Sequence, residues 1–165
     1  MSRVVLLTGS NDASAESVLQ RTAQLLEQRV GQITSRSDIY RSEAWGFTAE
    51  RDFLNQALLL ESELTAHEVL STVLDVEKQV GRNRDAEQQQ RAATGERYAS
   101  RVVDVDVMFY DDDILQSASL TLPHPLLHER EFALRPLCQI MGDYRHPVLG
   151  RSLNDILEDI ISRKA

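Results

Sequence analysis

Short apolar runs alternate with longer amphipathic segments along this chain, and the two patterns predict strands and helices respectively. Residues 3–8 hold a continuous apolar run that predicts a buried strand, and a polar turn is expected at 9–11. Apolar residues then recur at helical spacing from about 14 to 30, where Gly31 supplies a stop. A second strand is expected over 33–40, with polar alternation that leaves one face to water.

The same two patterns continue through the rest of the chain. The second helix opens with Thr65-Ala66-His67-Glu68, the Ser/Thr-x-x-Glu form of a capping box, and Gly81 ends it. The polar stretch that follows has no strand or helix periodicity and predicts a long loop. In order, the chain is expected to hold a strand over 53–61, a helix over 65–80, the loop over 82–100, a strand over 101–110, a hairpin over 114–122, and helices over 129–141 and 153–163.

This order of elements predicts the fold class. A β-α-β-β-α-β core followed by a hairpin and C-terminal helices is the ferredoxin-like arrangement. It is an α+β fold, in which we expect an antiparallel sheet with helices packed on one face. The length of 165 residues fits a single domain over 1–165.

Charge and cysteine content narrow the function classes. The net charge of −8 argues against a protein that coats nucleic acid. Sixteen of the eighteen basic residues are arginine, and five of these fall within 82–101, which indicates a small anionic ligand. Cys138 is the only cysteine, and no signal peptide or membrane span is visible, so we expect a cytoplasmic protein with no membrane contact. The sequence makes no prediction of oligomeric state.

The strand expected over 101–110 carries two aspartates among its valines. Side chains alternate between faces in a strand, so Asp104 and Asp106 share one face, roughly 6.6 Å apart. Val103, Val105 and Val107 fall on the other face, which we expect to be buried. Two neighbouring carboxylates repel unless a cation lies between them, and Mg²⁺ is the hard ion that suits such a pair. The solvated face of an edge strand is the alternative.

The histidines differ in their surroundings. His124 lies between two prolines that stiffen the backbone, which makes its ring a candidate contact for a phosphate or a ribose. A zinc site with His128 is disfavoured, because no cysteine is near and a proline interrupts the helix that such spacing needs. His67 and His146 have no supporting context and are expected on the surface.

The Gly-Ser-Asn turn expected at 9–11 lies between a strand and a helix, where backbone N–H groups can meet a phosphate. Its surroundings fit neither G-x-x-x-x-G-K-[ST] nor G-x-G-x-x-G, which excludes a P-loop and a dinucleotide fingerprint. A plain structural turn is the simpler interpretation of these residues alone.

Taken together, these motifs resemble those of the hydroxymethyl-dihydropterin pyrophosphokinases, a family of folate biosynthesis, over nearly the whole chain. The resemblance implies a ferredoxin-like enzyme that transfers pyrophosphate from ATP to the pterin alcohol and releases AMP, with two Mg²⁺ ions. The matching segments are Gly-Ser-Asn at 9–11, Phe-Leu-Asn-Gln-Ala at 53–57, Glu77 with Gly-Arg-x-Arg at 81–84, Arg-Val-Val-Asp-Val-Asp at 101–106, Pro-His-Pro at 123–125 and His-Glu-Arg-x-Phe at 128–132.

The resemblance also implies roles for individual residues. Asp104 and Asp106 resemble the ligands of both magnesium ions, and with Arg82 and Arg101 they make up the expected catalytic set. The expected ATP contacts are Glu77, Arg84, Val107, His124 and Arg130. The expected pterin contacts are Ser42, Trp45, Phe53, Asn55 and Phe132, in which the two phenylalanines sandwich the ring and the amide meets its edge.

Two other function classes fit parts of the pattern. Nucleotidyltransferases also combine Gly-Ser with Asp-x-Asp, but they place the aspartates shortly after the Gly-Ser, whereas more than half of this chain separates Ser10 from Asp104. A ferredoxin-like binding or regulatory domain would explain the fold and leave the paired aspartates and the arginine-rich loop without a task.

Overall fold

A computed structural model describes residues 1–42, 52–81 and 102–164. Trp45 and the arginines at 82, 84, 91, 97 and 101 lie outside these ranges, as does the expected loop over 82–100. The elements are β1 (Ser2–Ser10), α1 (Ala15–Arg29), β2 (Gln32–Arg36), β3 (Tyr40–Ser42), β4 (Phe53–Ser62), α2 (Ala66–Val80), β5 (Asp104–Tyr110), β6 (Leu115–Gln116), β7 (Thr121–Leu122), the short 3₁₀ helix η1 (Leu127–Glu129), α4 (Glu131–Met141) and α5 (Leu153–Lys164).

The main sheet has the order β2-β4-β1-β5, with β3 paired to β4 beyond the end of β2. All of its neighbouring strands run antiparallel. This order confirms the ferredoxin-like βαββαβ core, and β6 with β7 confirms the added hairpin.

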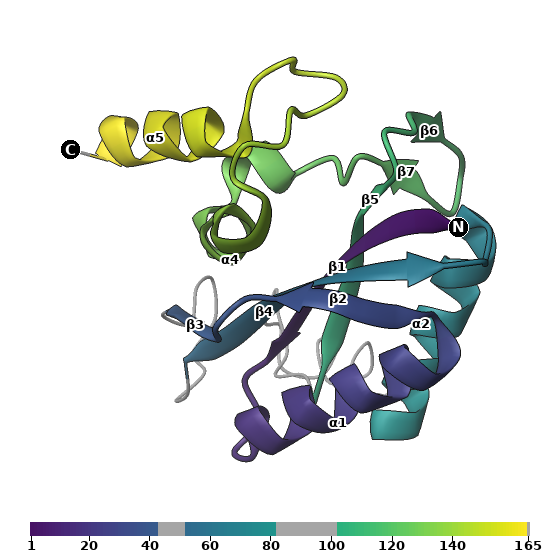
Figure 1. Ribbon diagram of the computed structural model, residues 1–165. Helices are drawn as coiled ribbons and strands as arrows, with labels where there is room; N and C mark the ends of the chain where they lie inside the picture. The colour runs from purple at the N-terminus through teal and green to yellow at the C-terminus, as the bar shows by residue number, and fades with distance from the viewer. Residues whose placement is uncertain (43–51, 82–101, 165) are drawn as a thin grey trace.

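Helices cover both faces of the sheet, so the expectation of helices on one face is wrong. Figure 1 shows α1 and α2 on one side, and α4 and α5 on the other. Val4 and Leu6 of β1 pack in the core with α1 and α2, whereas Val5 and Leu7 pack against α4 and α5. Burial on both faces explains the apolar run in β1, because a strand covered on both sides needs apolar residues at successive positions.

The single strand expected over 33–40 is two strands, β2 and β3. Ser37 lies between them and pairs with Ala57 of β4 through its backbone N–H (3.0 Å) and through its hydroxyl, which accepts the Ala57 N–H (2.9 Å). In a continuous strand a backbone carbonyl oxygen would accept the Ala57 N–H. Here the Ser37 hydroxyl accepts it instead, and the strand is interrupted between β2 and β3.

Local signals in the sequence set the bounds of α2 as expected. Thr65 Oγ1 accepts the N–H of Glu68 at 3.2 Å, and the Glu68 carboxylate accepts the N–H of Thr65 at 2.9 Å, which completes the capping box. Gly81 ends the helix with a φ of 122°, a conformation that favours glycine.

His146 is 5% exposed, so its expected surface position is wrong, whereas His67 is exposed as expected. The His146 Nδ1 accepts the N–H groups of Val148 (3.2 Å) and Leu149 (3.1 Å). Its ring lies edge-on to Phe109 with the centroids 5.8 Å apart. This histidine organises the turn before α5, a role that no local pattern indicated. Among the described residues, no helix is long and apolar enough to cross a membrane.

Candidate active site

Three residues from three strands form one row across the sheet. Gly9 of β1 lies opposite Asn55 of β4 on one side and opposite Asp104 of β5 on the other. Directly opposed residues of an antiparallel pair point to the same face, and neighbouring strands lie about 4.8 Å apart. Asn55 and Asp104 are therefore roughly 10 Å apart on the face that carries α4. A row further along, Leu7 lies opposite Asp106.

Gly9 has no side chain and so leaves a floor on which the Asn55 amide lies. A Cβ added at Gly9 would lie 2.5 Å from Nδ2 of Asn55, closer than real Cβ atoms approach any neighbour. The Asn55 amide is buried, and its Nδ2 donates to the carbonyl oxygen of Thr8 at 3.3 Å. The amide is thus held in place against the glycine.

The expected strand alternation is confirmed at the aspartates. Val103, Val105 and Val107 are buried in the core with α1 and α2. Asp104 and Asp106 are half-buried and follow the face of Met108, which packs in the other core. No cluster of three or more potential His, Cys, Asp or Glu metal ligands occurs within the described ranges. Two carboxylates that share a face fit Mg²⁺, which binds through one or two carboxylates and completes its shell with water and substrate phosphates.

Two buried side chains hold the backbone around Asp104. The hydroxyl of Ser10 donates to the carbonyl oxygen of Val102, two residues before Asp104. The carboxylate of Glu77 on α2 accepts the backbone N–H of Val105 at 2.8 Å. Ser10 and Glu77 are each 1% exposed. The strand segment that carries Asp104 is therefore fixed on both sides of that residue.

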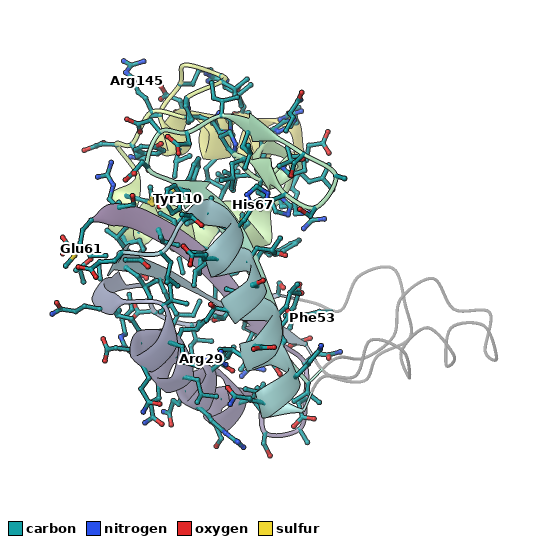
Figure 2. The ribbon with its side chains drawn as sticks, turned by 90° about the vertical axis from the view of Figure 1, so that its right-hand side faces the viewer. Arg29, Phe53, Glu61, His67, Tyr110 and Arg145 are labelled. Carbon is teal, nitrogen blue, oxygen red and sulfur yellow. The ribbon has the colours of Figure 1, made fainter. Side chains whose placement is uncertain are left out.

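Those candidate pterin contacts that the structure describes lie on the same face of the sheet. Ser42 of β3 pairs in register with Phe53 of β4. Phe53 lies two residues before Asn55 in the same strand, so the two side chains point to the same face. Figure 2 shows Phe53 at the opposite end of the sheet from Tyr110, which agrees with the strand register. Phe132 lies in the first turn of α4 and packs against the core on this face.

Glu131 ties the start of α4 to two other elements. One of its carboxylate oxygens accepts from the Tyr40 hydroxyl of β3 at 3.3 Å, and the other from Nζ of Lys164 in α5 at 2.9 Å. Arg130, the residue before it, holds its guanidinium 5.6 Å from the centroid of the Phe132 ring. Phe132, a candidate pterin contact, and Arg130, a candidate ATP contact, therefore lie together at the anchored start of α4.

The ring of His124 is half-buried, and the charges of Asp104 and Arg130 both act on its pKa. Burial is the largest cause that lowers the pKa of His124 to about 4; Arg130 lowers it further and Asp104 opposes the shift. Its Nδ1 accepts the N–H of Leu126 at 3.2 Å, and its own backbone N–H donates to Met108 at 3.0 Å. At neutral pH the imidazole is therefore uncharged, with its proton on Nε2, where it can donate a hydrogen bond.

Two expected ATP contacts lie away from this open face. The Val107 side chain is buried in the core with α1 and α2. Glu77 is buried at its bond to Val105. Sequence reasoning also treated Gly9 and Ser10 as a turn, whereas both belong to β1 and the floor at Gly9 was missed. A glycine inside a strand is a signal for close approach of another group, and that signal was present.

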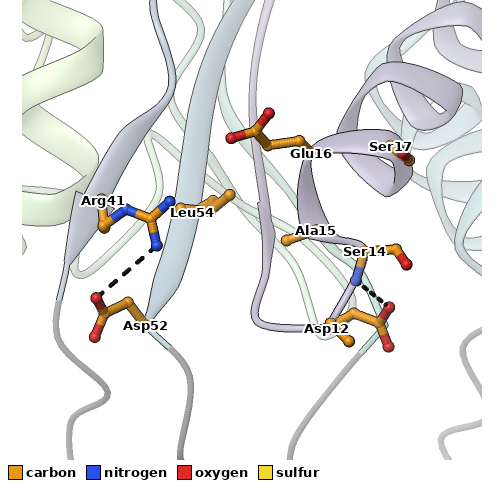
Figure 3. Close-up of a pocket in the computed structure, with 9 residues that line it drawn as sticks. Asp12, Ser14, Ala15, Glu16, Ser17, Arg41, Asp52 and Leu54 are labelled. Carbon is orange, nitrogen blue, oxygen red and sulfur yellow. Dashed lines mark hydrogen bonds and ion pairs between the residues drawn. The ribbon is translucent and has the colours of Figure 1, made fainter.

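A hollow of about 630 Å³ lies on the other face of the same sheet end. Figure 3 shows its lining at the start of α1 and along β3 and β4, where Arg41 pairs with Asp52 at 4.0 Å and Asp12 accepts the N–H of Ser14 at 3.0 Å. Arg41 lies in register with Leu54, which faces α1 and not the aspartates. The strand register, not the size of this hollow, identifies the candidate site.

Comparisons with known proteins show which family the chain belongs to. The family model of the 7,8-dihydro-6-hydroxymethylpterin-pyrophosphokinases matches residues 5–142. The chain belongs to this family. A pyrophosphokinase of Aquifex aeolicus is 31% identical over 155 residues, which are 94% of this chain and 90% of that protein. One of Methylorubrum extorquens is 34% identical over 144 residues, which are 87% of this chain and 85% of that one. Both carry the name 2-amino-4-hydroxy-6-hydroxymethyldihydropteridine pyrophosphokinase.

Solved structures show that the pyrophosphokinase fold extends over almost the whole chain. An HPPK-DHPS in complex with substrates matches 98% of this chain with a TM-score of 0.75 at 12% identity. A Plasmodium falciparum HPPK-DHPS with pteroate matches with a TM-score of 0.76 at 12% identity. This chain spans 44% and 45% of those two chains, and likeness at this identity concerns the fold alone.

Proposed function

We propose that this protein transfers pyrophosphate from ATP to the hydroxymethyl group of 6-hydroxymethyl-7,8-dihydropterin, in folate biosynthesis, and releases AMP. The pterin hydroxyl oxygen forms a bond to the β-phosphorus, the bond from that phosphorus to the α,β-bridging oxygen breaks, and the hydroxyl proton leaves to solvent. Membership of the pyrophosphokinase family and the names of relatives support this reaction. The observation that carries it is the row Asn55–Gly9–Asp104, which puts an amide residue and a carboxylate residue on one face of the sheet with their Cα atoms about 10 Å apart.

Asp104 and Asp106 would hold two Mg²⁺ ions together with the phosphate oxygens of ATP. Their shared face and partial burial fit hard cations that keep water and phosphate in their shells. The ions would neutralise the triphosphate and lower the pKa of the attacking hydroxyl. The aspartates, fixed on a strand, would keep this charge close to the pterin end of the site.

The pterin would lie beside the Asn55 amide, on the face of the sheet that carries α4. Phe53 and Phe132 come from the sheet and from α4 on the same face, and aromatic rings on two sides would hold a flat heterocycle by stacking. The Asn55 amide offers a donor and an acceptor to the edge of that heterocycle. Ser42 borders the same position, and Trp45, outside the described residues, completes the proposed pterin set.

ATP would meet His124 and Arg130 on the side of β5. A neutral His124 donates from Nε2 without adding charge, and Arg130 supplies a cation for a phosphate oxygen. Arg82, Arg84 and Arg101, outside the described residues, are proposed to engage the phosphates as well. The cytoplasmic location and the single domain over 1–165 stay predictions.

The products of the reaction test this proposal. Purified protein is incubated with ATP, Mg²⁺ and the reduced hydroxymethyl pterin, and the nucleotides are separated by chromatography. AMP that forms only when the pterin is present, in equal amount to the pterin diphosphate, supports pyrophosphoryl transfer. ADP would indicate transfer of a single phosphoryl group, free pyrophosphate would indicate nucleotidyl transfer, and either result contradicts the proposal.

A further inference from the structure

Glu77 is a buried acid whose described oxygen serves the protein backbone. It lies near the end of α2, is 1% exposed, and accepts the N–H of Val105 through Oε2 at 2.8 Å. Glutamate is almost never fully buried unless it is paired, because a desolvated carboxyl group is costly. The bond to β5 is therefore a feature that the fold maintains at a cost.

The backbone partner of Glu77 lies between the two aspartates. Val105 separates Asp104 from Asp106, and its N–H belongs to the peptide unit that begins at Asp104. Within the described sheet β5 is an edge strand, paired only with β1. N–H groups on such an edge have no strand partner. Glu77 supplies one for Val105, and so fixes the orientation of the peptide unit that joins Asp104 to Val105.

The side chains on the two sides of β5 make this support effective. Val105 packs in the core with α1 and α2, while Asp104 and Asp106 point to the face of α4. Glu77 approaches from α2, so it holds the strand from behind the candidate metal site. The Ser10 hydroxyl holds the Val102 carbonyl oxygen on the other side of Asp104.

We propose that Glu77 is a positioning residue that presets Asp104 and Asp106 for cation binding, and not a ligand of the nucleotide. The inference rests on the proposed function, because it takes the two aspartates as the metal ligands. A positioned ligand strand binds metal with less reorganisation, and groups that orient metal ligands commonly contribute about 10- to 100-fold to metal affinity. Glu77 would contribute through the backbone of Val105.

Three variants separate positioning from other roles. Glu77→Leu replaces the acceptor with an apolar side chain that can stay buried, and Glu77→Gln keeps an oxygen that can accept from Val105. Val76→Ala is the matched control, because it damages the buried face of the same helix one residue away and leaves Glu77 in place. Mn²⁺ binding in the presence of α,β-methylene-ATP is measured by electron paramagnetic resonance, and exchange of the Val105 amide by NMR.

We expect the wild-type Val105 amide to be protected from exchange, and Glu77→Leu to lose that protection together with about 10- to 100-fold in Mn²⁺ affinity. Glu77→Gln should lose clearly less of both, and Val76→Ala should keep both even where its unfolding midpoint drops. An unprotected wild-type amide overturns the proposal, and this result needs no variant to fold. Equal losses in Val76→Ala and Glu77→Leu, or unchanged Mn²⁺ affinity in Glu77→Leu, overturn it as well.

The wild-type protein is assayed for pterin-dependent AMP in parallel. A failure of the positioning role then appears, with an active wild type, as an unprotected Val105 amide, as unchanged Mn²⁺ affinity in Glu77→Leu, or as equal losses in Val76→Ala and Glu77→Leu. A failure of the proposed function appears as an inactive wild type, whatever the exchange of Val105.

Discussion

Asn55 and Asp104 stand on either side of Gly9, in one row across three strands of the sheet. The first belongs to the candidate pterin set and the second to the candidate metal set. The distance between the two sets is therefore fixed by the spacing of strands and not by a loop. A substrate that joins a flat ring to a reacting hydroxyl fits this arrangement.

Gly9→Ala should damage pterin binding selectively. The new Cβ would lie 2.5 Å from the Asn55 amide and must displace it, at a cost of about 1–3 kcal/mol. We expect the KM for the pterin to rise by about tenfold or more, because 1.4 kcal/mol corresponds to a factor of ten. The KM for ATP should change much less.

Gly142→Ala is the matched control for that variant. Its Cβ would also meet an amide side chain, 2.4 Å from Oδ1 of Asn154, but at the far end of α4. A pterin KM that rises as much in Gly142→Ala as in Gly9→Ala would show that the effect is general strain.

Phe53→Ala should weaken the binding of the pterin more than the binding of ATP. The ring is proposed to stack on the heterocycle, and an aromatic pair is worth about 0.5–1.5 kcal/mol beyond the area that it buries. Isothermal titration with the pterin and, separately, with α,β-methylene-ATP measures both affinities. Tyr110→Ala, at the other end of the sheet, is the control. Equal losses for the two ligands in Phe53→Ala would remove the stacking role.

The parts of this fold that the sequence predicts are those that depend on neighbours along the chain. The capping box at Thr65, the stop at Gly81 and the alternation of Asp104 with Val105 each follow from spacings of a few residues, and each is present. The aspartate pair was identifiable as a candidate metal site for the same reason.

What the sequence does not reveal depends on contacts between distant segments. The strand register sets Asn55 and Asp104 opposite Gly9, and three separate strands must be aligned before that row exists. The bond from Glu77 to Val105 spans 28 positions, so no local pattern contains it. Helix packing on the second face could have been foreseen, because successive residues of β1, on both of its faces, are apolar.

The stability of the protein should fall as the pH falls from 6.5 toward 4. The pKa of His124 is lowered from 6.5 to about 4, mainly by burial, so the unfolded chain binds more protons than the folded one across this window. Burial also lowers the pKa of His146, which adds a change of the same sign. Both contributions are fully present above pH 6.5 and are lost as the pH falls.

Urea unfolding at pH 7 and at pH 5 measures this effect. His124→Gln should show a smaller drop in unfolding free energy between the two pH values than the wild type, since it removes one of the two groups. His146→Gln should reduce the drop independently. A His124→Gln protein with the full wild-type drop would mean that His124 titrates normally in the folded state.

The role of the aspartate pair is tested by the rate of pterin-dependent AMP formation in Asp104→Asn and in Asp106→Asn, with Asp113→Asn as an exposed control beyond the end of β5. Each of the first two substitutions keeps the shape of the side chain and removes the charge that a Mg²⁺ ion needs. We predict a rate reduced by roughly 100-fold or more in each, equal to a loss of at least about 2.7 kcal/mol of transition-state stabilisation. The unfolding midpoint of both variants should stay close to that of the wild type. Asp113→Asn should have a normal rate. A near-normal rate in either Asp104→Asn or Asp106→Asn would contradict the metal assignment on which the proposed mechanism rests.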